Sequence, residues 1–185
     1  PVVFLYQGTN FNDSNHPFVR KARDSFGVVY EAKMIREMLD NPSGTGRKYA
    51  VIVPEPPNST ALVEFWHTNI VKPYSLSCDQ DFFDDFFKEI KSGNYGPKLD
   101  MSKRYAFGIS SGGYNTSRMA VSFNSGMANG NTFKALAVIS ASYATCGGIL
   151  CLVPRLPGNH PPTKFYHGAG DLAVPISTMH QYYRQ

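Results

Sequence analysis

The chain has 185 residues, of which 42% are hydrophobic, 14% aromatic and 17% charged, a composition typical of one globular domain spanning 1–185. No apolar run approaches the ~20 residues needed to cross a bilayer, and the mean hydropathy is −0.27, so a membrane span is excluded. The net charge is +4, but the basic side chains are scattered among acidic ones rather than gathered on one element, which excludes a nucleic-acid partner.

Buried strands and amphipathic helices alternate along the chain. In order, the pattern predicts strand 1–6, helix 31–39, strand 49–53, helix 81–90, strand 105–107, helix 117–121, strand 135–139, strand 164–166 and helix 176–183, with 140–162 irregular. Parallel strands need crossover connections, which are usually helices. The alternation therefore indicates an α/β fold, a parallel sheet with helices on both faces. In such sheets the functional groups gather beyond the carboxyl ends of the strands.

The strand at 105–107 leads into a glycine-rich turn, Gly108-Ile109-Ser110-Ser111-Gly112, which matches G-x-S-x-G between a strand and a helix. A serine hydroxyl is a weak nucleophile, so it must be presented on a sharp turn where a base can reach it. Ser110 is therefore the predicted nucleophile, and the backbone amide of Ser111 is a predicted oxyanion donor. The alternative is a turn that binds a phosphate or has no ligand, although a P-loop lysine is missing.

Two other strand ends are predicted to face this turn. The first strand ends in Gln7-Gly8-Thr9, and the amide of Thr9 is the predicted second oxyanion donor, the alternative being a plain turn. The last strand leads to Asp171, which is placed to orient a catalytic histidine.

The histidine itself is harder to place. Only His180 follows Asp171, and it lies in the predicted helix 176–183, so we expect it on the helix surface; His167 is expected to be structural. The 14 residues after Asp171 are fewer than the ~20 that another helix, strand and turns require. Because Pro1 also opens directly on a central strand, we expect the chain to be an interior portion of a longer domain, with edge strands and the base supplied from outside it.

The cysteine spacing predicts one disulfide. Cys146 and Cys151 flank two glycines that let the chain fold back, although two buried thiols are the alternative. A disulfide indicates an oxidising compartment. Cys78 is left over, either unpaired or bonded to something outside the chain. No cysteine or histidine pair has zinc-ligand spacing, so no metal is expected.

Several stretches together resemble a known family: VVFLYQGT at 2–9, YAFGISSGGYNTSRMAVSF at 105–123, SASYATC at 140–146 and HPP at 160–162. They resemble the secreted medium-chain-length polyhydroxyalkanoate depolymerases and, more broadly, the polyhydroxybutyrate depolymerases and feruloyl esterases, which have the α/β-hydrolase fold. The resemblance implies an extracellular serine esterase acting on an aliphatic polyester, without cofactor, with Ser110 as nucleophile, Asp171 as acid and Thr9 in the oxyanion loop. The family histidine has no matching position.

The substrate contacts remain open. Trp66, Asn69 and Tyr143 are expected to border the site, where an exposed aromatic ring packs against an alkyl chain, or else to belong to the core. A feruloyl or acetyl esterase acting on plant polysaccharide is one alternative function. Another is a catalytically incomplete fragment that only binds hydrophobic polymer. The sequence does not indicate the oligomeric state.

Overall fold

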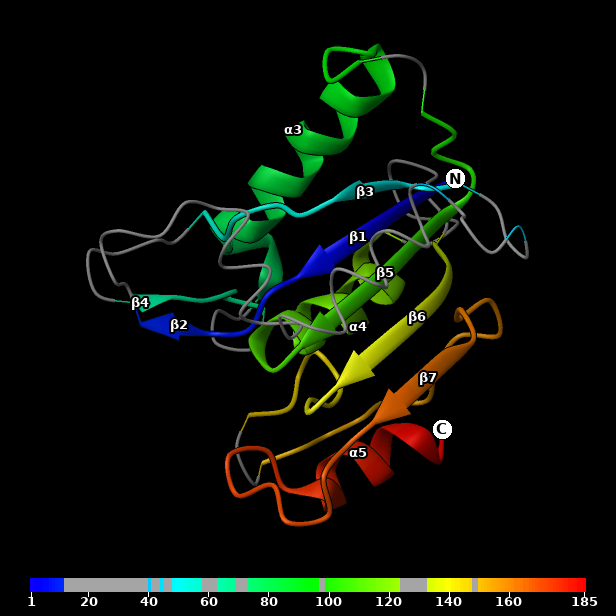
Figure 1. The fold of residues 1–185 in the computed structure, drawn as a ribbon. Coiled ribbons are helices and arrows are strands. Elements are labelled where there is room, and N and C mark those ends of the chain that lie inside the picture. The colour runs from blue at the N-terminus through cyan, green and yellow to red at the C-terminus, as the bar shows by residue number, and fades with distance from the viewer. Residues whose placement is uncertain are drawn as a thin grey trace.

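A five-stranded parallel sheet forms the centre of the molecule (Figure 1). The computed structural model describes residues 1–11, 40, 44, 48–57, 63–68, 73–96, 99–123, 133–147 and 150–185; the predicted helix at 31–39 and the predicted site residue Asn69 lie outside these ranges. The strands are β1 (Val2–Tyr6), β3 (Ala50–Ile52), β5 (Arg104–Ile109), β6 (Phe133–Ile139) and β7 (Thr163–Tyr166). The predicted α/β fold is thus confirmed.

The strand order, β3-β1-β5-β6-β7, places a topological switch point between β1 and β5, because the chain adds β3 on one side of β1 and all later strands on the other. Neighbouring strands are aligned so that Tyr6 lies beside Gly108, and Ile139 lies between Ile109 and Tyr166. The carboxyl ends of β1, β5, β6 and β7 therefore meet along one edge. Ligands of open α/β sheets bind at this edge, next to the switch point.

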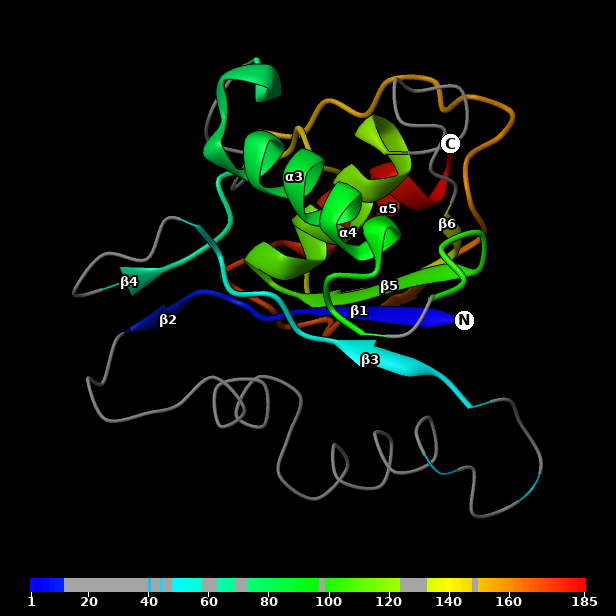
Figure 2. The same cartoon turned by 90° about the horizontal axis from the view of Figure 1, so that it is seen from above.

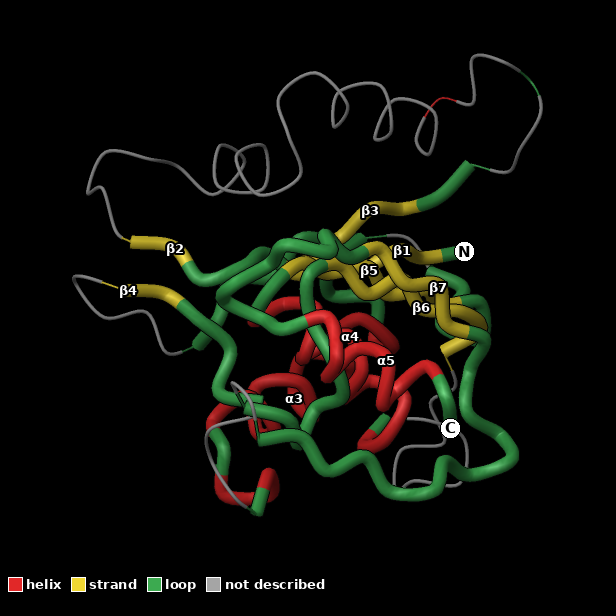
Figure 3. Tube along the Cα trace, turned by 90° about the horizontal axis from the view of Figure 1, so that it is seen from below, coloured by secondary structure: helices red, strands yellow, loops and turns green. Residues whose placement is uncertain are grey.

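The described helices, α3 (Cys78–Ser92), α4 (Ser111–Ser122) and α5 (Ile176–Tyr183), all cover the same face of the sheet (Figures 2 and 3). Helices over the opposite face, which the sequence also predicts, are not tested by the described ranges. None of the helices within those ranges is both long and apolar enough to span a bilayer.

Helix α3 is longer than its apolar face predicts, because both ends are capped. At its start the Ser77 hydroxyl accepts a hydrogen bond from the Asp79 amide at 3.1 Å. At its end Gly93 adopts φ 85°, the left-handed conformation that commonly ends helices.

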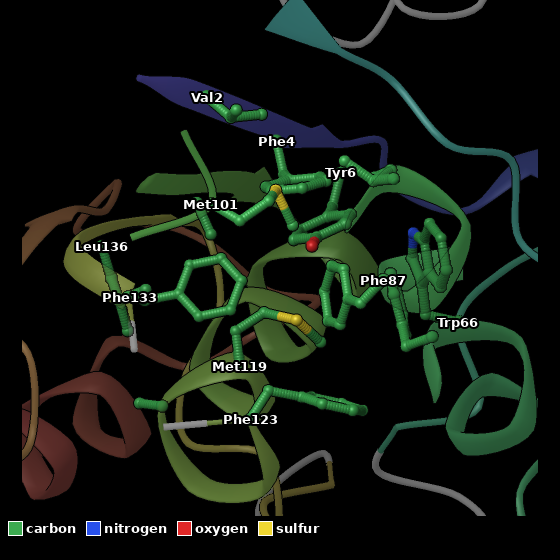
Figure 4. Packing of buried hydrophobic residues seen from close by; sticks show 14 of the residues in the cluster. Val2, Phe4, Tyr6, Trp66, Phe87, Met101, Met119, Phe123, Phe133 and Leu136 are labelled. Atoms are coloured by element: carbon green, nitrogen blue, oxygen red, sulfur yellow. The ribbon is translucent and has the colours of Figure 1, made fainter. Parts of the chain in front are cut away.

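An aromatic core joins α3 to the sheet (Figure 4). Phe4 of β1 meets Phe87 edge to face at 5.5 Å between ring centroids, and Phe87 meets Phe123 at 5.3 Å. Such pairs contribute ~0.5–1.5 kcal/mol each beyond the burial of their area. The apolar stripe predicted at 81–90 is therefore packing, and it fixes β1 against the helix layer.

Two smaller features differ from the expectation. Strand β3 is only half-buried, since it lies at an edge of the described sheet, whereas its sequence predicted a fully buried strand. A two-stranded antiparallel sheet of β2 (Asn10–Phe11) and β4 (Val63–Glu64) was not predicted. It lies beyond the carboxyl end of β1 (Figure 1), and a short 3-10 helix, η1 (Tyr74–Leu76), precedes α3.

Candidate active site

Ser110 occupies a sharp turn between β5 and α4. Its backbone has φ 53° and ψ −123°, a conformation that L-residues rarely adopt and that persists only when the surroundings enforce it. The Ser110 amide donates to the Ile139 carbonyl at 3.0 Å, and the Ser110 carbonyl accepts from the Tyr114 amide at 3.1 Å. The residue is partly exposed at the carboxyl edge of the sheet.

The two glycines that flank the turn are required by close backbone contacts. A Cβ atom on Gly108 would lie 2.2 Å from the Gly112 carbonyl oxygen, and one on Gly112 would lie 2.1 Å from the Tyr6 carbonyl oxygen. Both distances are far inside van der Waals contact. The pattern G-x-S-x-G is therefore needed sterically for β5, α4 and the end of β1 to meet here.

Two backbone segments approach the serine, the start of α4 and the segment after β1. The first three amides of a helix have no intrahelical acceptor, which leaves the Ser111 amide available to a ligand. The segment after β1, residues 7–9 and called here the β1 loop, lies against the turn: a Cβ on Gly8 would be 3.2 Å from the Ser110 Cβ. Thr9 follows Gly8 and is exposed. The structure thus brings together the loop and the helix start that the sequence singled out.

Asp171 lies in the loop between β7 and α5, residues 167–175 and called here the β7 loop. Its Oδ1 accepts hydrogen bonds from the Val174 amide at 2.9 Å and the Ala173 amide at 3.0 Å, and its Oδ2 is 3.5 Å from His167 Nε2. The bond from Val174 is the main cause that lowers the pKa of Asp171 below its ordinary 3.8, with Ala173, His167 and the Ser140 hydroxyl adding to it. The carboxylate is therefore ionised at neutral pH.

Ser110 and Asp171 belong to the same edge of the sheet. Only β6 separates β5 from β7, so the two strand ends are roughly 10 Å apart. Tyr114 lies one helical turn after Ser110; burial raises the pKa of its hydroxyl, and the negative charge of Asp171 raises it further. The Asp171 carboxylate therefore acts electrostatically on the hydroxyl of Tyr114, in the first turn of α4.

Three of the described histidines pair with groups other than the serine, and the fourth is exposed. The His167 side chain is buried and donates from Nε2 to the Val174 carbonyl at 2.7 Å, which agrees with its predicted structural role. His160 Nε2 pairs with the Tyr182 hydroxyl at 2.9 Å, and His67 Nδ1 lies 3.9 Å from Cys78 Sγ. His180 is exposed on α5, as predicted. Within the described ranges no histidine hydrogen-bonds to Ser110.

For two of the predicted substrate contacts, the structure supports the alternative that they belong to the core. Trp66 is 0% exposed and packs against Tyr6 and Phe83, each at 5.4 Å between ring centroids (Figure 4). Tyr143 is 3% exposed and packs edge to face on Tyr182 at 5.1 Å. Neither ring is accessible to a polymer chain, because tertiary contacts that the local sequence does not encode turn both inward.

The predicted disulfide forms between Cys146 and Cys151, whose Sγ atoms are 1.95 Å apart. Ser142, beside it, donates to the Thr178 carbonyl at 2.5 Å, and Cys151 Sγ lies 3.7 Å from the same oxygen. The disulfide closes a loop within the segment after β6, and the Ser142 bond holds that segment against the first turn of α5, next to the β7 loop. Cys78 belongs to no disulfide in the described part of the chain.

No group of three or more histidine, cysteine, aspartate or glutamate side chains that could hold a metal ion occurs within the described ranges. Within these ranges the candidate site therefore consists of Ser110 on its turn, the backbone segments beside it and the Asp171 carboxylate.

The strand order, the strained serine turn after β5 and the carboxylate in the β7 loop define the α/β-hydrolase fold. The chain is similar to a poly(3-hydroxyoctanoate) depolymerase of Pseudomonas fluorescens, with 47% identity over 189 aligned positions. The match covers 99% of this chain and 60% of the relative's length, and it confirms the resemblance found in the sequence motifs. No protein-family model matches the chain. The search of solved structures gave no significant match.

Proposed function

We propose that the chain is the catalytic region of an extracellular serine esterase that hydrolyses an aliphatic polyester, a medium-chain-length polyhydroxyalkanoate. The observation that carries the proposal is the strained conformation of Ser110 on its strand-to-helix turn. Strain of this kind is retained where it presents a reactive group. The substrate class is supported by the relative's name, a depolymerase of poly(3-hydroxyoctanoate).

In the proposed mechanism Ser110 Oγ attacks the carbonyl carbon of the ester while its proton passes to a histidine base. The negative oxygen of the tetrahedral intermediate accepts hydrogen bonds from the amides of Ser111 and Thr9. The carbon–oxygen bond to the leaving alcohol then breaks, and the alcohol takes the proton from the histidine. Water then attacks the carbonyl carbon of the acyl-enzyme with the help of the same base, the bond to Ser110 Oγ breaks, and the hydroxy acid is released.

Asp171 is proposed to orient that histidine and to stabilise its protonated form. Two backbone amides hold Oδ1 and fix the carboxylate, and the proposed acceptor of the imidazole N–H is Oδ2, which also lies 3.5 Å from His167 Nε2. Because three of the described histidines pair with other groups and His180 is exposed on the surface of α5, the base is proposed to come from outside the described residues. No cofactor is needed for this chemistry.

The extracellular location is supported by the Cys146–Cys151 disulfide, since disulfides persist in oxidising compartments. The proposed single catalytic domain includes all of residues 1–185.

The experiment compares three substrates on the natural full-length protein: a poly(3-hydroxyoctanoate) film, a feruloyl ester and an acetylated xylan. Release of hydroxyoctanoate monomers or dimers, lost in Ser110→Ala, is expected. Preferential release of ferulate or acetate would replace the polyester by plant polysaccharide as the substrate. Adsorption to the film without release of any product would leave a polymer-binding protein and overturn the esterase proposal.

A further inference from the structure

The fully buried Trp66 makes a polar contact in addition to its aromatic packing. Its indole Nε1–H donates to the backbone carbonyl of Gln7 at 3.1 Å. A buried indole N–H needs an acceptor, and many carbonyls can serve. Here the acceptor is the first residue of the β1 loop, which lies against Ser110.

Gln7 has a second contact, with Glu64 of β4. The Gln7 side chain is 0% exposed, and its Nε2 donates to Glu64 Oε2 at 3.3 Å. Glu64 also pairs with Asn10 in the small β2–β4 sheet, immediately after the β1 loop. The segment from Gln7 to Asn10 is therefore attached to one strand, β4, and to the tryptophan two residues beyond Glu64.

The Gln7 carbonyl is also in contact with the serine turn. A Cβ on Gly112 would lie 2.3 Å from the Gln7 oxygen, so the helix start and this carbonyl pack without space between them. The peptide unit is planar, and the Gly8 N–H lies in the same plane as the Gln7 C=O. Fixing that carbonyl fixes the plane of the Gln7–Gly8 peptide, on which the direction of the following Thr9 amide depends.

We propose that Trp66 is a positioning residue of the active site: by holding the Gln7 carbonyl, it orients the β1 loop so that the Thr9 amide faces the oxygen of the attacked ester. This inference rests on the proposed esterase function. Gly8 has no side chain to restrict its backbone, so the loop depends on external contacts for its orientation. Trp66 thus acts through Gln7 and does not touch the substrate.

The test replaces Trp66 in the full-length protein by 3-benzothienylalanine, which has nearly the same shape but a sulfur in place of the N–H, and separately by phenylalanine. Hydrolysis of p-nitrophenyl octanoate is measured for each variant. We expect kcat to fall by about 10- to 100-fold, the loss typical of a misplacement of ~1 Å. We expect KM to stay within roughly twofold, because the ground-state contacts are unchanged.

A second readout distinguishes positioning from packing. Each variant is also assayed on the thiono ester, in which sulfur replaces the carbonyl oxygen. Sulfur is larger and a weaker hydrogen-bond acceptor, so a well-formed oxyanion site favours the oxygen ester. The rate ratio of oxygen ester to thiono ester should therefore fall in both Trp66 variants. A loss of stability alone would leave this ratio unchanged.

Phe83→Leu is the matched control, because its ring stacks on Trp66 but has no polar contact with the loop. It should lower thermal stability and leave both kcat and the ratio unchanged. If the benzothienyl variant keeps the wild-type kcat and the wild-type rate ratio of oxygen ester to thiono ester, Trp66 is a packing residue only. This conclusion does not depend on whether Trp66→Phe folds. If a fluorophosphonate does not label wild-type Ser110, the esterase proposal fails, and this inference fails with it.

Discussion

The contact between α4 and β1 predicts a severe effect of Gly112→Ala. The added Cβ would lie 2.1 Å from the Tyr6 oxygen and 2.3 Å from the Gln7 oxygen, whereas real Cβ atoms essentially never come closer than 3.0 Å to such neighbours. Both neighbours are backbone atoms, so they cannot rotate away. The helix start and β1 must therefore separate by roughly 1 Å, a shift that costs about 100-fold in rate when it displaces reacting groups.

The stability cost follows from the same clash. Overpacking a tight contact costs about 1–3 kcal/mol, which lowers Tm by roughly 2–12 °C for a domain of this size. The assay is kcat for p-nitrophenyl octanoate in the full-length protein, with Tm from circular dichroism. Gly158→Ala is the matched control, because a Cβ there meets nothing within 4 Å. Wild-type kcat and Tm in Gly112→Ala would refute the role of this contact.

The other predictions concern Asp171 and the disulfide. Asp171→Asn should lower kcat by about 10³- to 10⁴-fold, the loss seen when a triad acid is neutralised, while KM changes little. The depressed pKa of Asp171 means that its contribution to folding is complete above about pH 3.8 and is lost as the pH falls below that value. The free energy of unfolding, measured with urea at a series of pH values around 3.8, should therefore fall less on acidification in Asp171→Asn than in the wild type. Parallel plots of this free energy against pH for the two proteins would contradict the prediction. Cys146→Ala with Cys151→Ala opens a loop of sequence separation 5 and should cost about 2 kcal/mol of stability. Cys78→Ala is the control, because Cys78 lies outside the disulfide. Equal Tm values for the double cysteine variant and for Cys78→Ala would contradict the prediction.

Features with a local cause were predictable from the sequence. The apolar run at the start of the chain became β1, and the periodic segment 176–183 became α5 with the same bounds. The serine turn was predictable because the G-x-S-x-G pattern stands in the sequence between an apolar strand and a helix, although the contacts that require Gly112 come from β1.

Features set by tertiary contacts were not predictable. Helix α4 begins at Ser111 rather than 117, since packing against the sheet overrides the poor helix propensity of two consecutive glycines. The two-residue strands β2 and β4 are too short to produce a periodic pattern. Trp66 follows β4, so its burial and its bond to Gln7 depend on a pairing that the sequence did not reveal.

The central claim, that Ser110 is the nucleophile, is tested most directly by covalent labelling. The folded full-length protein is treated with a fluorophosphonate, and the modified residue is located by peptide mapping. We predict a single labelled site at Ser110, lost in Ser110→Ala and retained in Ser102→Ala, which changes an exposed serine of the turn before β5. A label on another residue, or none in protein that hydrolyses the ester, would contradict the account.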